Sequence, residues 1–341
     1  MKLNKFSSIE QLRSVVKDVT SDTQFQGLDD NGEPVFDASV KLPTLEFQGR
    51  VKIHGTNASF GYDGENYWMQ SRNDILNVKN NNAGFYTFGM NVKEYMLPIL
   101  DKIYHEHDFD DIMVYGEFCG KGIQKGVAVS ELDKRFVVFD VMGIYHTDDG
   151  HKKVFLNQYI NLFDSKENFV FNIDMFDQYV VSIDFNNPEK SIDEIENIVK
   201  NVEKECPVGK KFGVEGIGEG VVFTHDVSNE KRYRFKAKGE KHSVTKVKKV
   251  VQIDVEKLNS IKEFVEYAVT KNRVLQATQS IGVEQSSLSE KNTGSIIKWT
   301  MIDIMKEESD TLIENNLTGK DITKEANIRI CQLYFELLKE F

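Results

Sequence analysis

The sequence predicts an α+β protein of two domains, because of its length and because its hydrophobic pattern changes near residue 250. Its 341 residues, 40% apolar and 28% charged, are typical of a folded chain with two domains. Up to about Tyr233, short β-like runs alternate with turns and helical stretches. After about Ile253, apolar residues recur at spacings of three and four. We therefore expect an N-terminal α+β domain over residues 1–250 and an all-helical C-terminal domain over residues 251–341.

Several elements of the N-terminal domain follow from local pattern. Arg50–Ile53 leads through a break at Gly55 into a second run, and Asp63-Gly64 is a hairpin turn signal. Ser191 and Glu194 have the spacing of a helix capping box. The predicted strands are Arg50–Ile53, Ala58–Tyr62, Tyr67–Met69, Ile112–Tyr115, Phe136–Val141 and Gly220–Thr224, and the predicted helices are Ser8–Val19, Asn91–Tyr104 and Ser191–Lys204.

The C-terminal domain is predicted to contain about four helices, because three apolar stripes have helical spacing. The stripes are Leu258, Ile261, Phe264, Val265 and Ala268; then Ile296, Ile297, Met301, Ile304 and Met305; then Ile328, Ile330, Leu333, Leu337 and Leu338. No internal repeat or low-complexity linker separates these helices from the N-terminal domain.

Composition also indicates the cellular compartment. The N-terminus has no apolar signal segment, and the chain has no run of about 18 uncharged apolar residues. Cys119, Cys206 and Cys331 lie far apart without a C-x-x-C pair, which suits a reducing compartment and offers no zinc framework. We expect a cytoplasmic protein without a membrane span and without disulfides.

Charge is distributed unevenly along the chain. The net charge of −11 argues against a nucleic-acid partner, yet residues 231–249 contain nine Lys/Arg and a single acid, Glu240. Because screening acts over about 8 to 10 Å, such a local basic segment can bind an anion in an acidic protein. A solvated lysine-rich face is the alternative, and composition alone does not decide between them.

The segment Arg232–Lys238 sharpens this choice, because it alternates as a strand does. Tyr233, Phe235 and Ala237 would face one side, while four cations would face the other and repel one another unless an anion lies there. An exposed edge strand protected by lysines is the alternative. We favour phosphate binding by the cationic face, which consists of Arg232, Arg234, Lys236 and Lys238.

A possible nucleophile stands at the end of the first predicted strand. In Lys52-Ile53-His54-Gly55-Thr56-Asn57, an amine lies beside a glycine turn and small polar groups, although one K-x-x-G tetrapeptide is weak support. Glu117, Asp140 and Glu219 each lie at or near a strand end. Taken singly they read as surface acids; together with glycines and a cationic strand they indicate a metal–nucleotide cleft. The phosphate-loop pattern G-x-x-x-x-G-K-[ST] is absent, which disfavours a kinase-like or P-loop ATPase.

Six motifs occur in order along the chain: Lys52-x-His54-Gly55-Thr56-Asn57, Ser71-Arg72, Tyr115-Gly116-Glu117-Phe118, Phe136-x-x-Phe139-Asp140, Glu219-Gly220-x-Val222 and Lys236-x-Lys238. Their order and approximate spacing resemble those of the covalent nucleotidyltransferases, and their residues resemble those of the ATP-dependent RNA ligases of the phage RNA ligase 2 type. The similarity also includes Gly122-Ile123-Gln124-Lys125 and extends weakly to Thr300–Ile304. Two features depart from the pattern: the stretch before Lys52 is long, which leaves residues 1–45 unassigned, and Thr224-His225 replaces a more usual lysine.

The resemblance implies a nucleotidyltransferase domain with antiparallel sheets and flanking helices, and three nucleotidyl transfers. Lys52 attacks the α-phosphorus of ATP, AMP passes to an RNA 5′-phosphate, and a 3′-OH then displaces AMP. The amine must be neutral to attack, so the pKa of Lys52 must fall about three units below the ordinary value for lysine. Positive charge from Lys236, Lys238 and Mg²⁺ (or Mn²⁺) would favour the neutral form.

The resemblance also assigns a role to each matching residue. Phe139 would stack on adenine and Glu117 would hold the ribose. Val51, Arg72, Lys236 and Lys238 would line the ATP site; Glu219, and with it Asn57, would hold the metal. His54, Asn57 and Asp140 would assist catalysis, and Gln124, Lys125 and Lys241 would contact RNA.

The implied partner is nicked double-stranded RNA or an RNA/DNA hybrid, which the helical domain would bind. The resemblance also implies a monomer in the cytoplasm, or in the host cytoplasm for a phage-encoded protein. Two rival functions stay open: a DNA ligase or capping-type nucleotidyltransferase, which usually carries a five-stranded barrel in place of the helices, and a non-catalytic nucleic-acid-binding protein with a ligase-like core.

Overall fold

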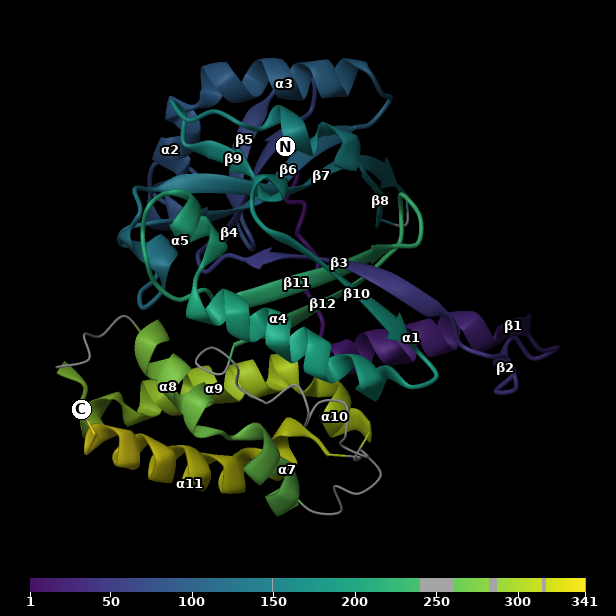
Figure 1. The fold of residues 1–341 in the computed structure, drawn as a ribbon, viewed down its shortest axis with the longest axis vertical. Helices are drawn as coiled ribbons and strands as arrows, with labels where there is room; N and C mark the ends of the chain where they lie inside the picture. The colour runs from purple at the N-terminus through teal and green to yellow at the C-terminus, as the bar shows by residue number, and fades with distance from the viewer. Residues whose placement is uncertain (149, 240–260, 282–286, 315–316, 341) are drawn as a thin grey trace. The chain divides into compact units, whose positions relative to one another are not determined.

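The computed structural model describes residues 1–148, 150–239, 261–281, 287–314 and 317–340 (Figure 1). Its chain divides into two units, each made of three stretches. The first unit comprises Met1–Glu10, Leu45–Ser182 and Ile198–Lys236; the second comprises Gln11–Thr44, Ile183–Asn197 and Ala237–Phe341. The predicted contact Lys241 lies outside the described residues.

A sheet of six strands forms the aromatic core of the first unit. Its strands run in the order β5-β4-β6-β7-β8, all antiparallel, and β9 pairs with β7 in parallel. Phe60, Phe85 and Phe136 pack against one another between this sheet and the helix that follows β5. The strands are β4 Thr56–Tyr62, β5 Tyr67–Ser71, β6 Asp111–Cys119, β7 Arg135–Thr147, β8 Gly150–Phe155 and β9 Val170–Asn172.

A second sheet of four strands carries the cationic segment. Its order is β10-β3-β11-β12, and β11 pairs antiparallel with β3 so that Gly220 lies opposite Lys52. Along β12, Tyr233, Phe235 and Ala237 are buried and the alternate residues are less buried, which is the period of two that the sequence predicts. The strands are β3 Thr44–Lys52, β10 Gln178–Asp184, β11 Gly220–Asp226 and β12 Arg232–Lys238.

Helices lie at positions close to those predicted, and α3 packs on β4 and β6 (Figure 1). Both boundaries of the first helix are wrong. It ends at Gln24 rather than Val19, and it begins at Leu12 rather than Ser8 because the Glu10 carbonyl accepts the Lys236 N–H at 3.0 Å and pairs with β12. These helices are α1 Leu12–Gln24, α2 Phe85–Asn91, α3 Lys93–His105, α4 Ile192–Lys204 and α5 Pro207–Lys211, with 3₁₀ turns η1 Asn82–Gly84, η2 Ala128–Glu131, η3 Asn157–Leu162, η4 Ile173–Met175 and η5 Pro188–Ser191.

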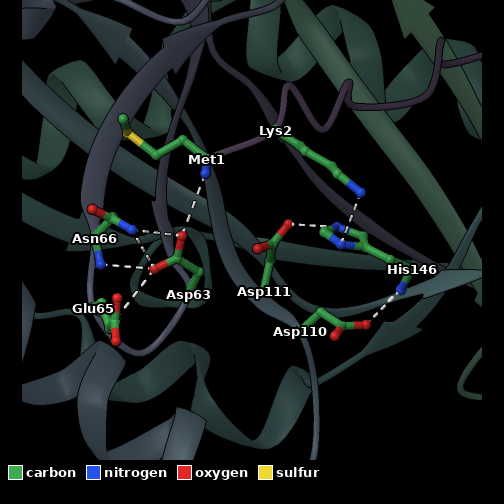
Figure 2. Close-up of a pocket in the computed structure, with 8 residues that line it drawn as sticks. All are labelled: Met1, Lys2, Asp63, Glu65, Asn66, Asp110, Asp111 and His146. Atoms are coloured by element: carbon green, nitrogen blue, oxygen red, sulfur yellow. Dashed lines mark hydrogen bonds and ion pairs between the residues drawn. The ribbon is translucent and has the colours of Figure 1, made fainter.

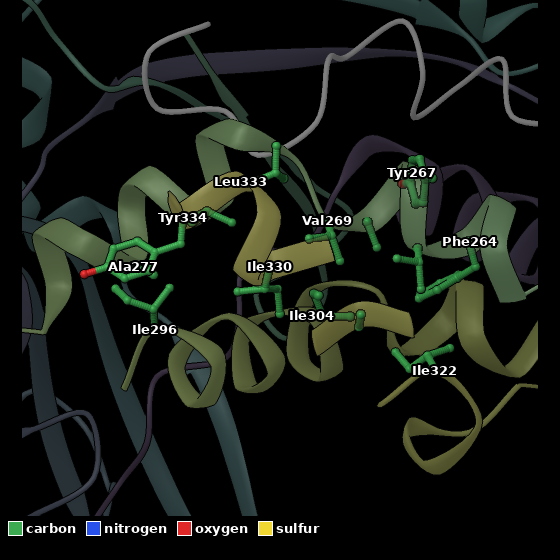
Figure 3. Packing of buried hydrophobic residues seen from close by; sticks show 14 of the residues in the cluster. Phe264, Tyr267, Val269, Ala277, Ile296, Ile304, Ile322, Ile330, Leu333 and Tyr334 are labelled. Atoms are coloured by element: carbon green, nitrogen blue, oxygen red, sulfur yellow. The ribbon is translucent and has the colours of Figure 1, made fainter. Parts of the chain in front are cut away.

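Helices dominate the C-terminal part, as the apolar stripes predict. Phe264, Ile304 and Ile330 are fully buried in one apolar cluster (Figure 3). The described residues from 261 onward contain helices and no strand. The elements are α7 Ile261–Ala268, α8 Lys271–Ser280, η8 Glu290–Asn292, α9 Thr293–Glu307, α10 Ser309–Glu314 and α11 Gly319–Leu338, and the same unit includes the hairpin β1 Phe25–Leu28 and β2 Pro34–Phe36.

The predicted fold class is confirmed: antiparallel sheets with flanking helices precede a helical C-terminal region. Among the described residues, no helix is both long and apolar enough to cross a membrane.

Candidate active site

Strand pairing brings Lys52 and Glu219 together. Lys52 is the last residue of β3 and lies opposite Gly220, so Glu219 is placed beside the amine. Lys52 Nζ is 2.8 Å from Glu219 Oε2, and His54 Nδ1 is 3.2 Å from the same oxygen. Glu219 is only 3% exposed, whereas Lys52 and His54 are 21% and 26% exposed. A buried carboxylate therefore holds two basic groups that both reach solvent.

Glu117 is the second carboxylate of this cluster. The Gly55 N–H donates to Glu117 Oε1 at 3.0 Å. A β-carbon at Gly55 would stand 2.4 Å from the Phe118 carbonyl oxygen, so this close approach of β6 to the segment after Lys52 requires glycine. Burial raises the pKa of Glu117 to about 7; Glu219 adds to the rise, while Lys52, the Gly55 N–H and Arg72 oppose it.

Asn57 lies on the strand next to Glu117. It belongs to β4, and the β4–β6 ladder sets it directly opposite Glu117. The short turn from Lys52 to Thr56 thus joins the two sheets and carries His54 and Gly55 between them. Five of the residues singled out in the sequence, Lys52, His54, Asn57, Glu117 and Glu219, are brought to this one junction.

The N-terminal segment contacts two more of the predicted site residues, Arg72 and Phe139. Sequence reasoning missed the role of this segment. Arg72 Nη2 donates to Ser8 Oγ at 2.6 Å, and the Phe6 ring packs edge-on against Phe139 with centroids 5.0 Å apart. Phe6 also packs on Tyr115. The only signal for this role was the long stretch before Lys52, whose residues 1–45 the sequence left unassigned.

The first half of the cationic strand faces a buried carboxylate, Asp140. Arg232 Nη1 lies 2.5 Å from Asp140 Oδ1, and Arg234 Nη2 lies 2.8 Å from Asp140 Oδ2. Arg232 also pairs with Asp226. The anion that the four cations were expected to need is therefore supplied in part by the protein itself, and Arg232 and Asp140 are nearly inaccessible. Lys236 and Lys238 follow on the same face, partly exposed.

The remaining predicted residues lie around the junction. Val51 is buried in β3, one residue before Lys52. Gln124 Nε2 donates to the Gly55 carbonyl at 3.4 Å, and Lys125 beside it is exposed. His225, part of the departure from the motif pattern, has Nδ1 2.8 Å from the Glu46 carbonyl oxygen and packs against Phe47. Because a carbonyl only accepts, His225 Nδ1 is the donor there.

The carboxylates near Lys52 suit a metal ion that also binds substrate phosphates, rather than a metal ion bound by protein ligands alone. Among the described residues, no three His, Cys, Asp or Glu side chains converge as metal ligands. Mg²⁺ usually takes one or two carboxylates and completes its shell with substrate phosphates and water. Glu219 offers such a carboxylate, so the residues fit a nucleotide-bound Mg²⁺.

A separate polar pocket of about 310 Å³ lies near the start of β6 and contains none of the predicted site residues. Figure 2 shows Asp63 hydrogen-bonded to Asn66 and His146 facing Asp111. Asp63 follows the end of β4, whereas Asn57 is near its beginning, so the pocket lies at the other end of that strand. Its lining consists of Met1, Lys2, Asp63, Glu65, Asn66, Asp110, Asp111 and His146.

Residues 45–238, more than half of the chain, match the RNA ligase family. The chain belongs to the RNA ligase family. The match begins in β3 and ends with Lys238, so it contains Lys52, Glu117, Glu219 and the cationic strand. It excludes the first 44 residues and the helical C-terminal region.

Solved structures of a Naegleria gruberi RNA ligase are similar at low identity. A variant with ATP and Mn has 14% identity and a TM-score of 0.44, covering 73% of this chain and 58% of that one. The same ligase with PPi has 15% identity and a TM-score of 0.43, covering 70% and 56%. This family member thus spans less than two thirds of those proteins, and such low similarity carries no functional argument.

Proposed function

We propose that the protein is an ATP-dependent RNA ligase of the phage RNA ligase 2 type, which seals 3′-OH/5′-phosphate nicks in duplex RNA or RNA-containing hybrids. The observation that carries the proposal is Lys52 Nζ, partly exposed and 2.8 Å from the buried Glu219, inside the segment that matches the RNA ligase family. Covalent nucleotidyl transfer needs a positioned and accessible amine nucleophile, and Glu219 positions this amine.

In the first step Lys52 Nζ attacks the α-phosphorus of ATP. A nitrogen–phosphorus bond forms, the bond to pyrophosphate breaks, and the neutral amine releases one of its two protons. Glu219 holds the amine at the end of β3, and His54, which contacts the same oxygen at 3.2 Å, provides a solvent-facing route for the released proton. Bound Mg²⁺ would supply charge neutralisation at the phosphates, with Glu219 as its protein ligand.

Around the nucleotide, Phe139 stacks on adenine and Glu117 holds the ribose. Val51 lines the site, and Arg72, Lys236 and Lys238 contact phosphate. Phe6 and Ser8 support this set, because they pack against Phe139 and bind Arg72. Asp140 acts by holding Arg232 and Arg234 in place, a positioning role that its two ion pairs favour over metal binding.

In the second step an RNA 5′-phosphate attacks the lysine-linked AMP, and in the third a 3′-OH attacks the resulting adenylate and expels AMP. Asn57 lies five residues after Lys52, and Gln124, next to Lys125, contacts the Gly55 carbonyl. These three residues contact the RNA ends. The C-terminal domain, whose boundary we place near residue 250, binds the RNA duplex. The enzyme acts as a monomer in the cytoplasm.

Intact-mass measurement after incubation with ATP and Mg²⁺, without RNA, tests the proposal. We expect one AMP adduct, absent in Lys52→Ala. No adduct on the parent protein, or an adduct that persists in Lys52→Ala, would contradict the assignment.

A DNA ligase or a capping enzyme is the second candidate. The described residues from 261 onward are helical, without the strands of a barrel domain, which favours the RNA ligase. Labelling with GTP in place of ATP tests for capping, and sealing of nicked duplexes with RNA or DNA on each side of the break separates the two ligases. A non-catalytic protein would give no adduct with either nucleotide.

A further inference from the structure

Acidic residues are missing from two stretches of the first unit, each of which contains an exposed loop. Ile75–Lys93 and Phe118–Ser130 contain no Asp or Glu, although acids make up 54 of the 341 residues, about one in six. Both stretches include exposed lysines: Lys79 and Lys93 in the first, Lys121 and Lys125 in the second. In a chain of net charge −11, a polyanion would meet little repulsion along these loops apart from the exposed Asp133, which pairs with Lys121.

Contacts join the two loops into one surface that starts next to Lys52. Gln124 binds the Gly55 carbonyl, which links loop Gly120–Gly126 to the turn after Lys52. Gly120 packs on the Lys134 backbone, where a β-carbon would be 2.7 Å from the Lys134 Cα. Lys134 Nζ in turn donates to the Ala83 carbonyl at 2.6 Å. We call the exposed surface formed by Asn77–Gly84, Gly120–Gly126 and Lys134 the acid-poor surface.

The loop Asn77–Gly84 is held in an unusual conformation. Asn82, Ala83 and Gly84 all have positive φ, at 43°, 56° and 98°, which is an unfavourable conformation for the two non-glycine residues. Asn81 Oδ1 accepts the Thr87 N–H, and Lys134 binds Ala83, so the loop is fixed by hydrogen bonds at its C-terminal end. At its tip Val78 is 78% exposed beside Lys79.

The charges differ in how available they are. Lys121 pairs with Asp133 at 3.6 Å, and Lys134 is used in bracing Ala83. In the part of the chain that the structure describes, Lys79 and Lys125 have no ion pair. These two side chains are therefore the cations that a ligand on this surface would meet.

We propose that the acid-poor surface holds the sugar–phosphate backbone of one RNA strand leading to Lys52, with Lys79 and Lys125 as phosphate contacts and Val78 against a base or ribose. The inference rests on the proposed function. Exposed lysines spread over a surface suit a phosphate backbone, which is bound by many weak contacts, better than a single small anion, which needs converging donors. The acid-poor surface adds to the grip assigned to the helical region.

Binding of a fluorescently labelled nicked RNA duplex to the full chain, measured over a range of salt concentrations, tests the inference. We expect Lys79→Ala and Lys125→Ala each to weaken RNA affinity about threefold to fivefold. Each should also reduce the slope of log affinity against log salt by about 0.7 to 1, in line with loss of one phosphate contact. Lys166→Ala is the matched control, because Lys166 is exposed in the same unit but lies between Asp164 and Glu167.

Unchanged salt slopes in both variants, or equal losses in Lys166→Ala, would overturn the inference. Slower Lys52 adenylylation without RNA, at unchanged RNA affinity, would overturn it too, because the lysines would then serve ATP. A parent protein that forms no AMP adduct defeats the proposed function whatever its salt slope, so the two failures are distinguishable.

Discussion

Glu219 in the first unit and Glu308 in the second are both buried carboxylates with two basic partners, yet their surroundings differ. Glu308 is fully buried and pairs with Arg273, itself fully buried, and with Arg13, which is 10% exposed. Tyr267 also donates to it at 3.1 Å. The partners of Glu219, by contrast, are a lysine and a histidine that are 21% and 26% exposed.

The comparison teaches that the accessibility of the partners, rather than burial of the acid, separates the proposed reactive site from a structural ion-pair network. Arg273, in α8, also pairs with Asp303, in α9. Its planar guanidinium therefore joins α8 to α9 and to Glu308, the residue after α9. A ligand cannot reach Glu308 without unfolding this network. At Glu219 an incoming phosphate or cation can exchange with the amine, because the amine already faces solvent.

Replacing Lys52 by arginine gives the largest expected effect and separates charge from chemistry. The guanidinium should keep an ion pair with Glu219 but is always protonated and cannot attack ATP. We expect AMP adduct formation to fall below detection while the urea midpoint of unfolding stays close to that of the parent. Adduct formation by Lys52→Arg would place the nucleophile elsewhere, and Lys166→Arg serves as the control.

Removing Arg273 should destabilise the second unit strongly. Arg273→Met removes the fully buried cation from Glu308 and Asp303 and leaves Arg13 as a partner of Glu308. Breaking a buried pair in this way costs about 3 to 5 kcal/mol. Denaturant unfolding measures the loss. The double variant Arg273→Met/Glu308→Gln should recover part of it, because the uncompensated charge is then removed. A loss below about 1 kcal/mol would mean that the network contributes little.

Lys236→Ala tests the second half of the cationic strand. If Lys236 contacts phosphate, the change should slow AMP adduct formation about a hundredfold, the scale for one preorganised charge. If it is only a solvated lysine, the rate should be unchanged and stability should shift by under about 0.5 kcal/mol. Rapid-quench adenylylation assays distinguish these outcomes.

Arg232 lies on the same strand face as Lys236, yet it is unsuitable as a neutral control for that test. Arg232 is 3% exposed and pairs with Asp140, so Arg232→Ala should destabilise the fold and confuse the comparison. Lys231, the exposed residue before it, is also unsuitable because its amine lies over the Tyr233 ring. Lys166→Ala is the better control, since it is exposed and outside both sheets.

Local pattern predicted most of the sheet and helix positions because the signals were local. The alternation of β12, the Asp63-Gly64 hairpin and the apolar stripes of α7, α9 and α11 each depend on neighbouring residues only. Lys52 and Glu219 could be singled out as candidates by motif, but their 2.8 Å contact depends on the β3–β11 register, between residues 167 positions apart.

The missed features share a cause: each depends on a distant segment. The extended path of residues before Leu12 requires β12, and the roles of Phe6 and Ser8 require Phe139 and Arg72. The pairing of Asp140 with Arg232 and Arg234 likewise joins β7 to β12. Long-range pairing of this kind leaves no periodic trace in either segment.

Glu117→Gln tests the smallest of these effects, the protonation of the second site carboxylate. The pKa of Glu117 rises from 4.5 to about 7 in the folded protein, chiefly by burial. Between these values the folded state holds a proton that the unfolded chain has released, so this group's contribution to stability is full below pH 4.5 and is lost as pH rises through about 7. Glutamine cannot titrate, so the free energy of unfolding of the parent should fall by on the order of 2 kcal/mol relative to the variant between pH 5 and pH 8.

Urea unfolding at both pH values measures the difference, with the exposed Glu167→Gln as control. Equal pH dependence in parent and Glu117→Gln would show that Glu117 ionises as a solvated acid, and the buried ribose-binding role proposed for it would then lose its support.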